Sequence, residues 1–178
     1  MIILAVESSG NVASAAIAER SKILAEYTVN IGKTHSQTLL PMIDRVLGDA
    51  EMSVNDLDAI AVSRGPGSFT GLRIGSATAK GLAASAGIPI IDVPTLEALA
   101  VGVGNAGGRL ICPIIDARRN EVYSALFEEN DRFGSVGGVQ GSTHGPLTRI
   151  GQERALGMEQ LLAELTAMDR EVIFVGDA

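Results

Sequence analysis

A strand followed by a hairpin occurs twice in this chain. The apolar run 4–6 ends at Glu7 and is followed by a polar turn and a second apolar run at 12–16. The run 114–115 ends at Asp116 and is followed in the same way by a turn and an apolar run at 122–126. A pattern that recurs over half a chain is typical of a duplicated half-domain. The repeat therefore predicts two related halves, residues 1–100 and residues 109–178.

The first half is expected to run strand, strand, strand, helix, strand, helix, strand. The expected strands are 2–6, 12–18, 23–29, 59–62 and 88–93. The first three predict an antiparallel meander, because only short polar turns separate them.

Capping signals and apolar spacing place the helices of this half. Thr34 and Gln37 have the spacing of a capping box, and Pro41 is expected either to bend that helix or to delay its start. A short capped turn is expected at 53–57 and a second helix at 72–86. Thr95 is expected to cap a third helix that ends near residue 103.

The second half is expected to be shorter than the first. A Gly-rich polar excursion fills 130–146, a helix is expected at 153–167, and a strand at 171–175. Only three residues follow the strand at 171–175, which leaves the second half shorter than the first.

Composition limits the possible functions. The net charge of −7 argues against a nucleic-acid-binding surface, although a local basic patch remains compatible with it. The single cysteine, Cys112, lies in an apolar run and is expected to be a small buried hydrophobe. Without a signal peptide or an apolar run of membrane-spanning length, the chain is expected to be cytoplasmic with no membrane contact.

The carboxylates of Glu7 and Asp116 allow two interpretations. In one, they face each other across a cleft and hold a metal-bound nucleotide. In the other, each accepts hydrogen bonds from amides of its own turn. The second interpretation is favoured, because the turn after Asp116 contains no glycine through which backbone amides could approach a phosphate.

Residues 63–75 are rich in glycine and also allow two interpretations. They lack the lysine of a phosphate-binding P-loop, but helix amides with Arg64 or Arg73 could still bind an anion. Alternatively, the glycines form a tight turn with close backbone packing. The following helix has Gly75, Ala79 and Ala83 on one stripe, so it could pack closely against a partner chain.

The two histidines, His35 and His144, have no second ligand at metal-binding spacing. There is no G-x-S-x-G nucleophile motif. The sequence therefore predicts neither a metal site nor a cofactor nor nucleophilic hydrolysis.

Four segments together resemble the TsaB family, and the likeness extends from Met1 to about Glu128, with a weaker continuation to Val175. The segments are Met1 to Ser9, Thr34-His35-Ser36-Gln37-x-Leu39-Leu40-Pro41, Arg64-Gly65-Pro66-Gly67-Ser68-Phe69-Thr70-Gly71-Leu72-Arg73-Ile74-Gly75, and Ile115-Asp116-Ala117-Arg118-x-x-Glu121-Val122-Tyr123. The resemblance implies an α/β architecture of the actin-like, duplicated ribonuclease-H-like kind, with mixed sheets flanked by helices and a second half that is truncated relative to the family.

The resemblance also implies a non-catalytic dimerisation subunit for tRNA threonylcarbamoyladenosine synthesis. Such a subunit binds a TsaD-like catalytic paralogue and a TsaE-like ATPase, meets tRNA only through the complex, and forms a homodimer in isolation. The alternatives are a glycoprotease-like metallopeptidase and a stand-alone actin-like ATPase.

Two sets of site residues follow from the resemblance and the motifs. The partner interface is expected at His35, Leu39, Leu40, Ile43, Leu47, Leu72, Gly75, Ala79, Leu82 and Ala83. Anion or nucleotide contacts are expected at Arg64, Gly65, Gly67, Gly71, Arg73, Glu7 and Asp116.

Overall fold

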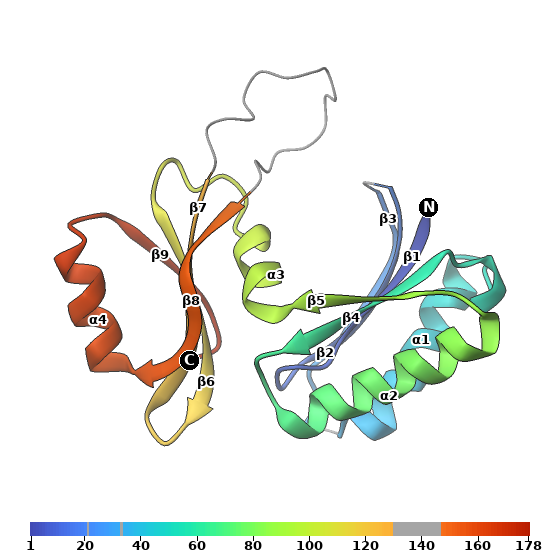
Figure 1. Ribbon diagram of the computed structural model, residues 1–178. Coiled ribbons are helices and arrows are strands. Elements are labelled where there is room, and N and C mark those ends of the chain that lie inside the picture. Colours follow the sequence, from blue (N-terminus) through green and yellow to red (C-terminus); the bar gives the residue numbers. More distant parts are fainter. Residues whose placement is uncertain (21, 33, 130–146) are drawn as a thin grey trace, which may run out of the picture. The chain divides into compact units, whose positions relative to one another are not determined.

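The computed structural model describes residues 1–20, 22–32, 34–129 and 147–178. The chain divides into two compact units, Met1–Thr95 and Leu96–Ala178 (Figure 1). The Gly-rich excursion expected at 130–146, with His144 inside it, lies outside the described residues. Within the described ranges no helix is long and apolar enough to cross a membrane.

Unit 1 contains a five-stranded mixed sheet in the order β3-β2-β1-β4-β5. Its strands are β1 (Ile2–Glu7), β2 (Ala13–Glu19), β3 (Lys22–Val29), β4 (Ala59–Gly65) and β5 (Ile90–Pro94). β2 runs antiparallel to β1 and β3, whereas β1, β4 and β5 are mutually parallel. The predicted meander is therefore confirmed.

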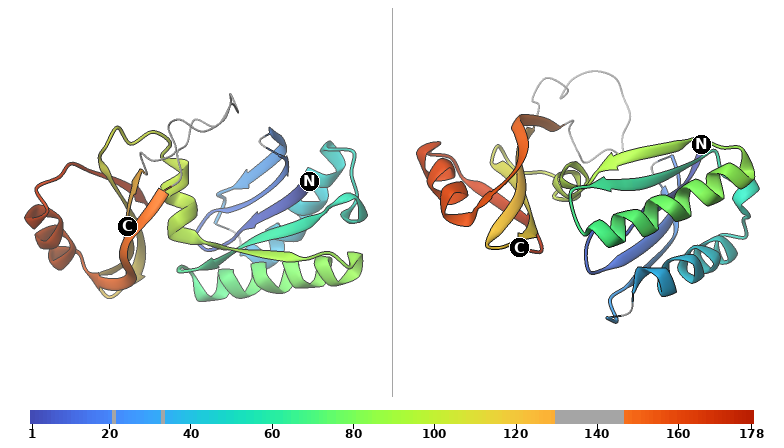
Figure 2. Two further views of the ribbon diagram at one scale, coloured as in Figure 1. Left: turned by 45° about the horizontal axis from the view of Figure 1, so that its top comes forward. Right: turned by 60° about the horizontal axis from the view of Figure 1, so that its bottom comes forward.

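Two helices, α1 (His35–Asp49) and α2 (Phe69–Ala86), pack on the same face of this sheet (Figure 2). Leu4 pairs with Ile17 on one side and with Ile60 on the other, so the three side chains share a face and are fully buried. Leu39 and Ile43 of α1 and Ala79 of α2 complete this core. Burial of each large aliphatic side chain stabilises the fold by about 1.5–3 kcal/mol.

α1 has its N-cap at the predicted residue, but without the predicted side-chain bonds. The helix begins at His35 and continues through Pro41, and Thr34 is its N-cap without a side-chain capping bond. The hydroxyl of Thr34 instead lies 3.1 Å from that of Ser36, so the predicted capping box is wrong. A capping box does form in the short 3₁₀ helix η1 (Val54–Asp56), where Asp56 accepts hydrogen bonds from the backbone and hydroxyl of Ser53 at 2.8 and 2.7 Å.

Unit 2 repeats the topology of the first four strands of unit 1. Its strands β6 (Leu110–Arg118), β7 (Glu121–Glu129), β8 (Leu147–Gly157) and β9 (Val172–Gly176) form a sheet in the order β8-β7-β6-β9. The helix α4 (Met158–Ala167) follows β8 as α1 follows β3. β4 and β9 also end alike, on Gly65 and Gly176 with φ of +110° and +137°. The internal repeat is thus present in the structure.

The expected helix at 153–167 is wrong at its beginning. Residues 153–157 continue β8, because Ala155 pairs with Tyr123 and Leu156 pairs with Val122 and is buried. Strand pairing decides the structure here over local helix propensity.

Thr95 and residues 69–71 also depart from the expected boundaries. Thr95 is the first residue of α3 (Thr95–Gly102), and its buried hydroxyl has no hydrogen-bond partner in the described part of the chain, so it does not cap the helix. α2 begins at Phe69, three residues before the expected start.

Candidate functional site

The turn between β4 and α2 consists of Pro66, Gly67 and Ser68. Ser68 is the N-cap of α2, and its hydroxyl accepts a hydrogen bond from the Gly71 amide at 3.3 Å. The Ser68 amide donates to the Ser9 carbonyl at 2.6 Å. The helix start is therefore tied directly to the turn between β1 and β2.

Three glycines of this region, Gly67, Gly71 and Gly75, line the surface on which Ser8 and Ser9 lie. A Cβ at Gly71 would overlap the Ser8 carbonyl oxygen, and one at Gly75 would overlap the Ser8 hydroxyl. A Cβ at Gly67 would lie 2.5 Å from the Ser9 carbonyl oxygen. The missing side chains therefore allow the β1–β2 turn to pack against α2.

Polar contacts fix this arrangement. The Ser8 hydroxyl, which is fully buried, donates to the Gly71 carbonyl at 3.0 Å. From α1, Nε2 of His35 donates to the Gly10 carbonyl at 2.8 Å. The sequence gives no sign of this role for His35, because α1 and the β1–β2 turn are far apart along the chain.

The same contacts reduce what the turn could offer to an anion. The amide of Ser68 bonds to Ser9, and that of Gly71 bonds to the Ser68 hydroxyl. Arg64 forms an ion pair with Asp92 at 2.8 Å, and the Arg73 guanidinium lies 5.1 Å from the centre of the Phe69 ring. Close packing is the interpretation that these contacts favour, and the anion contact at Arg64, Gly65, Gly67, Gly71 and Arg73 stays a prediction.

The two strand-end carboxylates accept bonds within their own turns. Glu7 Oε1 accepts the amide of Ser9, and Asp116 Oδ1 accepts the amide of Arg118 at 2.7 Å. This is the turn-amide interpretation, which is confirmed at both positions. A nucleotide contact of Glu7 and Asp116 stays a prediction without support from these bonds.

The residues expected at the partner interface fall into two groups. Those on the sheet-facing sides of α1 and α2 are buried in the core of unit 1: Leu39, Ile43, Leu47, Gly75, Ala79 and Ala83. His35, Leu72 and Leu82 are half-buried, whereas Leu40 is 54% exposed. Buried side chains could shape an interface only indirectly, and the partner interface at both groups stays a prediction.

Phe69 is absent from the expected interface, although the structure exposes 73% of it at the start of α2. The signal available in the sequence is its chemistry, because Phe69 is one of the few aromatic residues in a chain with 3% aromatic content. Large exposed aromatic side chains are typical anchors of protein interfaces.

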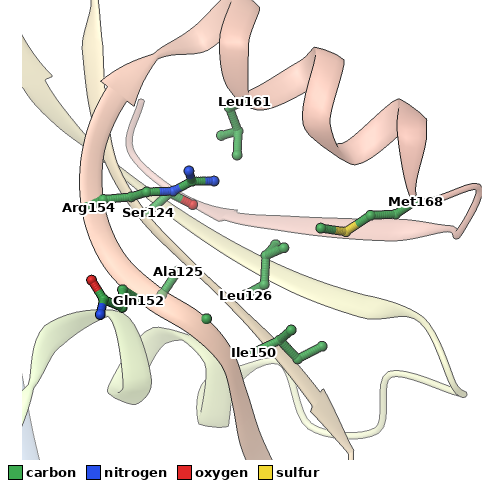
Figure 3. Close-up of a pocket in the computed structure, with 9 residues that line it drawn as sticks. Ser124, Ala125, Leu126, Ile150, Gln152, Arg154, Leu161 and Met168 are labelled. Carbon is green, nitrogen blue, oxygen red and sulfur yellow. The ribbon is translucent and has the colours of Figure 1, made fainter.

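Unit 2 contains a cavity of about 340 Å³ between β7, β8 and α4 (Figure 3). Leu126, Ile150, Leu161 and Met168 line it, and Arg154 on its wall pairs with Glu164. That guanidinium holds the pKa of the Glu164 carboxyl below its usual value. The cavity is therefore mainly apolar, and its arginine is already neutralised.

Cys112 belongs to the same buried apolar cluster as Leu126 and Leu161, and a 3.2 Å hydrogen bond joins its sulfur to the Ser124 hydroxyl. Burial raises the pKa of the thiol, so the thiolate is scarce at neutral pH. Among the described residues, no group of three His, Cys, Asp or Glu side chains is placed to share a metal ion.

Comparison with known proteins gives consistent matches. The family model named TsaD, tRNA N6-adenosine threonylcarbamoyltransferase, matches residues 22–178. The Bacillus subtilis tRNA threonylcarbamoyladenosine biosynthesis protein TsaB is 36% identical over 99% of this chain and 71% of its own length. The Escherichia coli protein of the same name is 37% identical over 74% of this chain, which spans only 57% of that relative.

Solved structures agree in fold. YeaZ from Pseudomonas aeruginosa is 31% identical with a TM-score of 0.73, over 89% of this chain and 68% of that chain. A second structure, of an uncharacterized protein with similarity to peptidase YeaZ from Pseudomonas aeruginosa, is 27% identical with a TM-score of 0.77, over 99% of this chain and 83% of that one.

The repeated strand order and these structural matches define a duplicated α/β protein of the actin-like, ribonuclease-H-like class. Within that class, the chain belongs to the TsaB family.

Proposed function

We propose that this chain is a non-catalytic partner subunit in tRNA threonylcarbamoyladenosine biosynthesis, which binds a TsaD-like catalytic paralogue and a TsaE-like ATPase. The observation that carries the proposal is how the glycine-rich region is used. Its glycines seat the β1–β2 turn on α2 through Ser8 and Ser9, while Phe69 at the start of the same helix is exposed.

Two features support a binding role over a catalytic one. The amides of Ser68 and Gly71 at the start of α2, and the carboxylates of Glu7 and Asp116, are engaged within the protein. By contrast, covering exposed apolar side chains with a partner stabilises the complex by about 25 cal/mol per Å² of apolar surface buried. Phe69 and Leu40 are large side chains of this kind on the two helices of unit 1.

The names of the curated relatives support a role in tRNA threonylcarbamoyladenosine biosynthesis. Several of them are called tRNA threonylcarbamoyladenosine biosynthesis protein TsaB. The TsaD family model, which matches most of this chain, is named for the transferase itself. A subunit that shares its ancestor with the catalytic paralogue is expected to resemble both the TsaB relatives and the TsaD family model.

Reconstitution tests this function. The isolated chain should transfer no threonylcarbamoyl group to tRNA, and the TsaD-like and TsaE-like proteins should show full transfer only when the chain is added. Transfer at the same rate without the chain, or transfer by the chain alone, would contradict the proposal.

We further propose that the isolated chain forms a homodimer through the α1–α2 surface. Sedimentation should then show a dimer that the paralogue converts to a heteromer. A monomer at every concentration would remove homodimerisation and leave the partner role intact.

A further inference from the structure

The turn between β6 and β7 has an unusual backbone. Arg118, Arg119 and Asn120 are consecutive and have φ of +66°, +54° and +61°. Left-handed residues in hairpin turns are usually Gly, Asn or Asp, because a longer side chain is disfavoured there. Two of the three positions nevertheless carry arginine.

The two arginines are also unpaired. Both are exposed, and neither guanidinium has a hydrogen-bond or ion-pair partner among the described residues. The Asp116 carboxylate accepts the Arg118 backbone amide, and Glu121 lies opposite Arg118 in the strand register. The arginines therefore stabilise nothing visible within the fold.

The corresponding turn of unit 1 provides a contrast. There the residues after Glu7 are covered, since Ser8 and Ser9 bond to Gly71 and Ser68 of the α2 region. One repeat thus has its hairpin turn sealed by a helix, and the other presents two cations to solvent.

We infer that the turn 118–120 is a contact site for the phosphate backbone of RNA. This inference rests on the proposed function, in which a tRNA is the substrate of the complex. An arginine guanidinium can donate two parallel hydrogen bonds to one phosphate, and such contacts position RNA without reading its sequence. The site would act within the assembled complex, because a chain of net charge −7 repels RNA overall.

The test uses the complete complex with a tRNA transcript, titrated at several potassium chloride concentrations. The double variant Arg118→Gln/Arg119→Gln should weaken tRNA binding about tenfold at low salt and reduce the slope of log affinity against log salt by about two, one for each lost phosphate contact. Its melting temperature should stay unchanged. The guanidinium groups have no partner within the described fold, and glutamine and arginine have similar preferences for left-handed backbone.

Two further variants are matched controls. Arg149→Gln removes an exposed charge from β8 of the same unit and should leave affinity and salt slope unchanged. Arg118→Lys/Arg119→Lys keeps both charges and should retain the salt slope while losing part of the affinity.

Three results would overturn the inference or what it rests on. An unchanged salt slope in the glutamine variant would show that the arginines do not meet phosphate. Weaker assembly with the paralogue, at unchanged tRNA affinity of the assembled complex, would assign the turn to an acidic protein surface. Failure of the unaltered chain to assemble at all would contradict the proposed function and the inference together.

Discussion

At the scale of single residues, Gly71 and Gly81 lie on one helix in opposite surroundings. A Cβ at Gly71 would overlap the Ser8 carbonyl oxygen and lie 3.1 Å from the His35 ring, whereas a Cβ at Gly81 would have no neighbour within 4 Å. Substitutions at these two positions therefore separate the close packing that a glycine allows from the helix stability that it loses.

We expect Gly71→Ala to lower the free energy of unfolding by about 1–3 kcal/mol, because the β1–β2 turn must move away from α2. Gly81→Ala should raise it by about 0.5–1 kcal/mol through better helix propensity. Urea denaturation of the two variants measures both. Equal effects at the two positions would show that the glycine contacts with Ser8 are unimportant.

The buried thiol gives a second residue-scale prediction. Because burial raises the pKa of Cys112, native protein at neutral pH should react with a disulfide reagent far more slowly than unfolded protein. Rapid reaction of the native chain would show that the β6–β7 region opens readily.

At the scale of elements, the sequence predicts the strands of unit 1 well, whereas no strand was expected at β8 (Leu147–Gly157). Continuous apolar runs such as 2–6 and 59–62 become strands, because parallel strands buried within a sheet need apolar side chains throughout. Residues 153–157 were expected to be helical, but they pair with β7, a partner that local spacing does not reveal. Thr34 fails as a capping box for a similar reason, since its hydroxyl has a competing partner in Ser36.

The capping box of η1 predicts a pH dependence. Hydrogen bonds from Ser53 lower the pKa of the Asp56 carboxyl below its usual value. This contribution to stability is present above the unfolded-state pKa and is lost as pH falls through the lower folded-state pKa. The free energy of unfolding should therefore fall more steeply with acid in the unaltered protein than in Asp56→Asn, and parallel curves would contradict the bond.

At the scale of the whole molecule, the repeat explains how one topology serves two units. Both sheets place three antiparallel strands beside a parallel fourth. The repeat was visible in the sequence because each copy begins with a buried run that ends at a carboxylate. The different use of the two hairpin turns was not visible, because it depends on Ser8 and Ser9 meeting glycines more than 55 residues away along the chain.

The same limit applies to the partner surface. Helical spacing identified the apolar positions of α1 and α2. It could not show that Leu39 is buried while its neighbour Leu40 is exposed, because burial depends on the packing of the sheet. Substitution of Leu39 would test the core of unit 1, whereas Leu40 and Phe69 test the surface.

The affinity of the chain for its TsaD-like paralogue, measured by titration calorimetry, tests the central claim most directly. Phe69→Ala and Leu40→Ala should each weaken the complex, Phe69→Ala by about tenfold or more, as expected when an interface anchor is removed. Ile23→Ala, which truncates a side chain of 58% exposure on β3, should leave the affinity unchanged. A complex of equal affinity in all three variants, or no complex with the unaltered chain, would contradict the account.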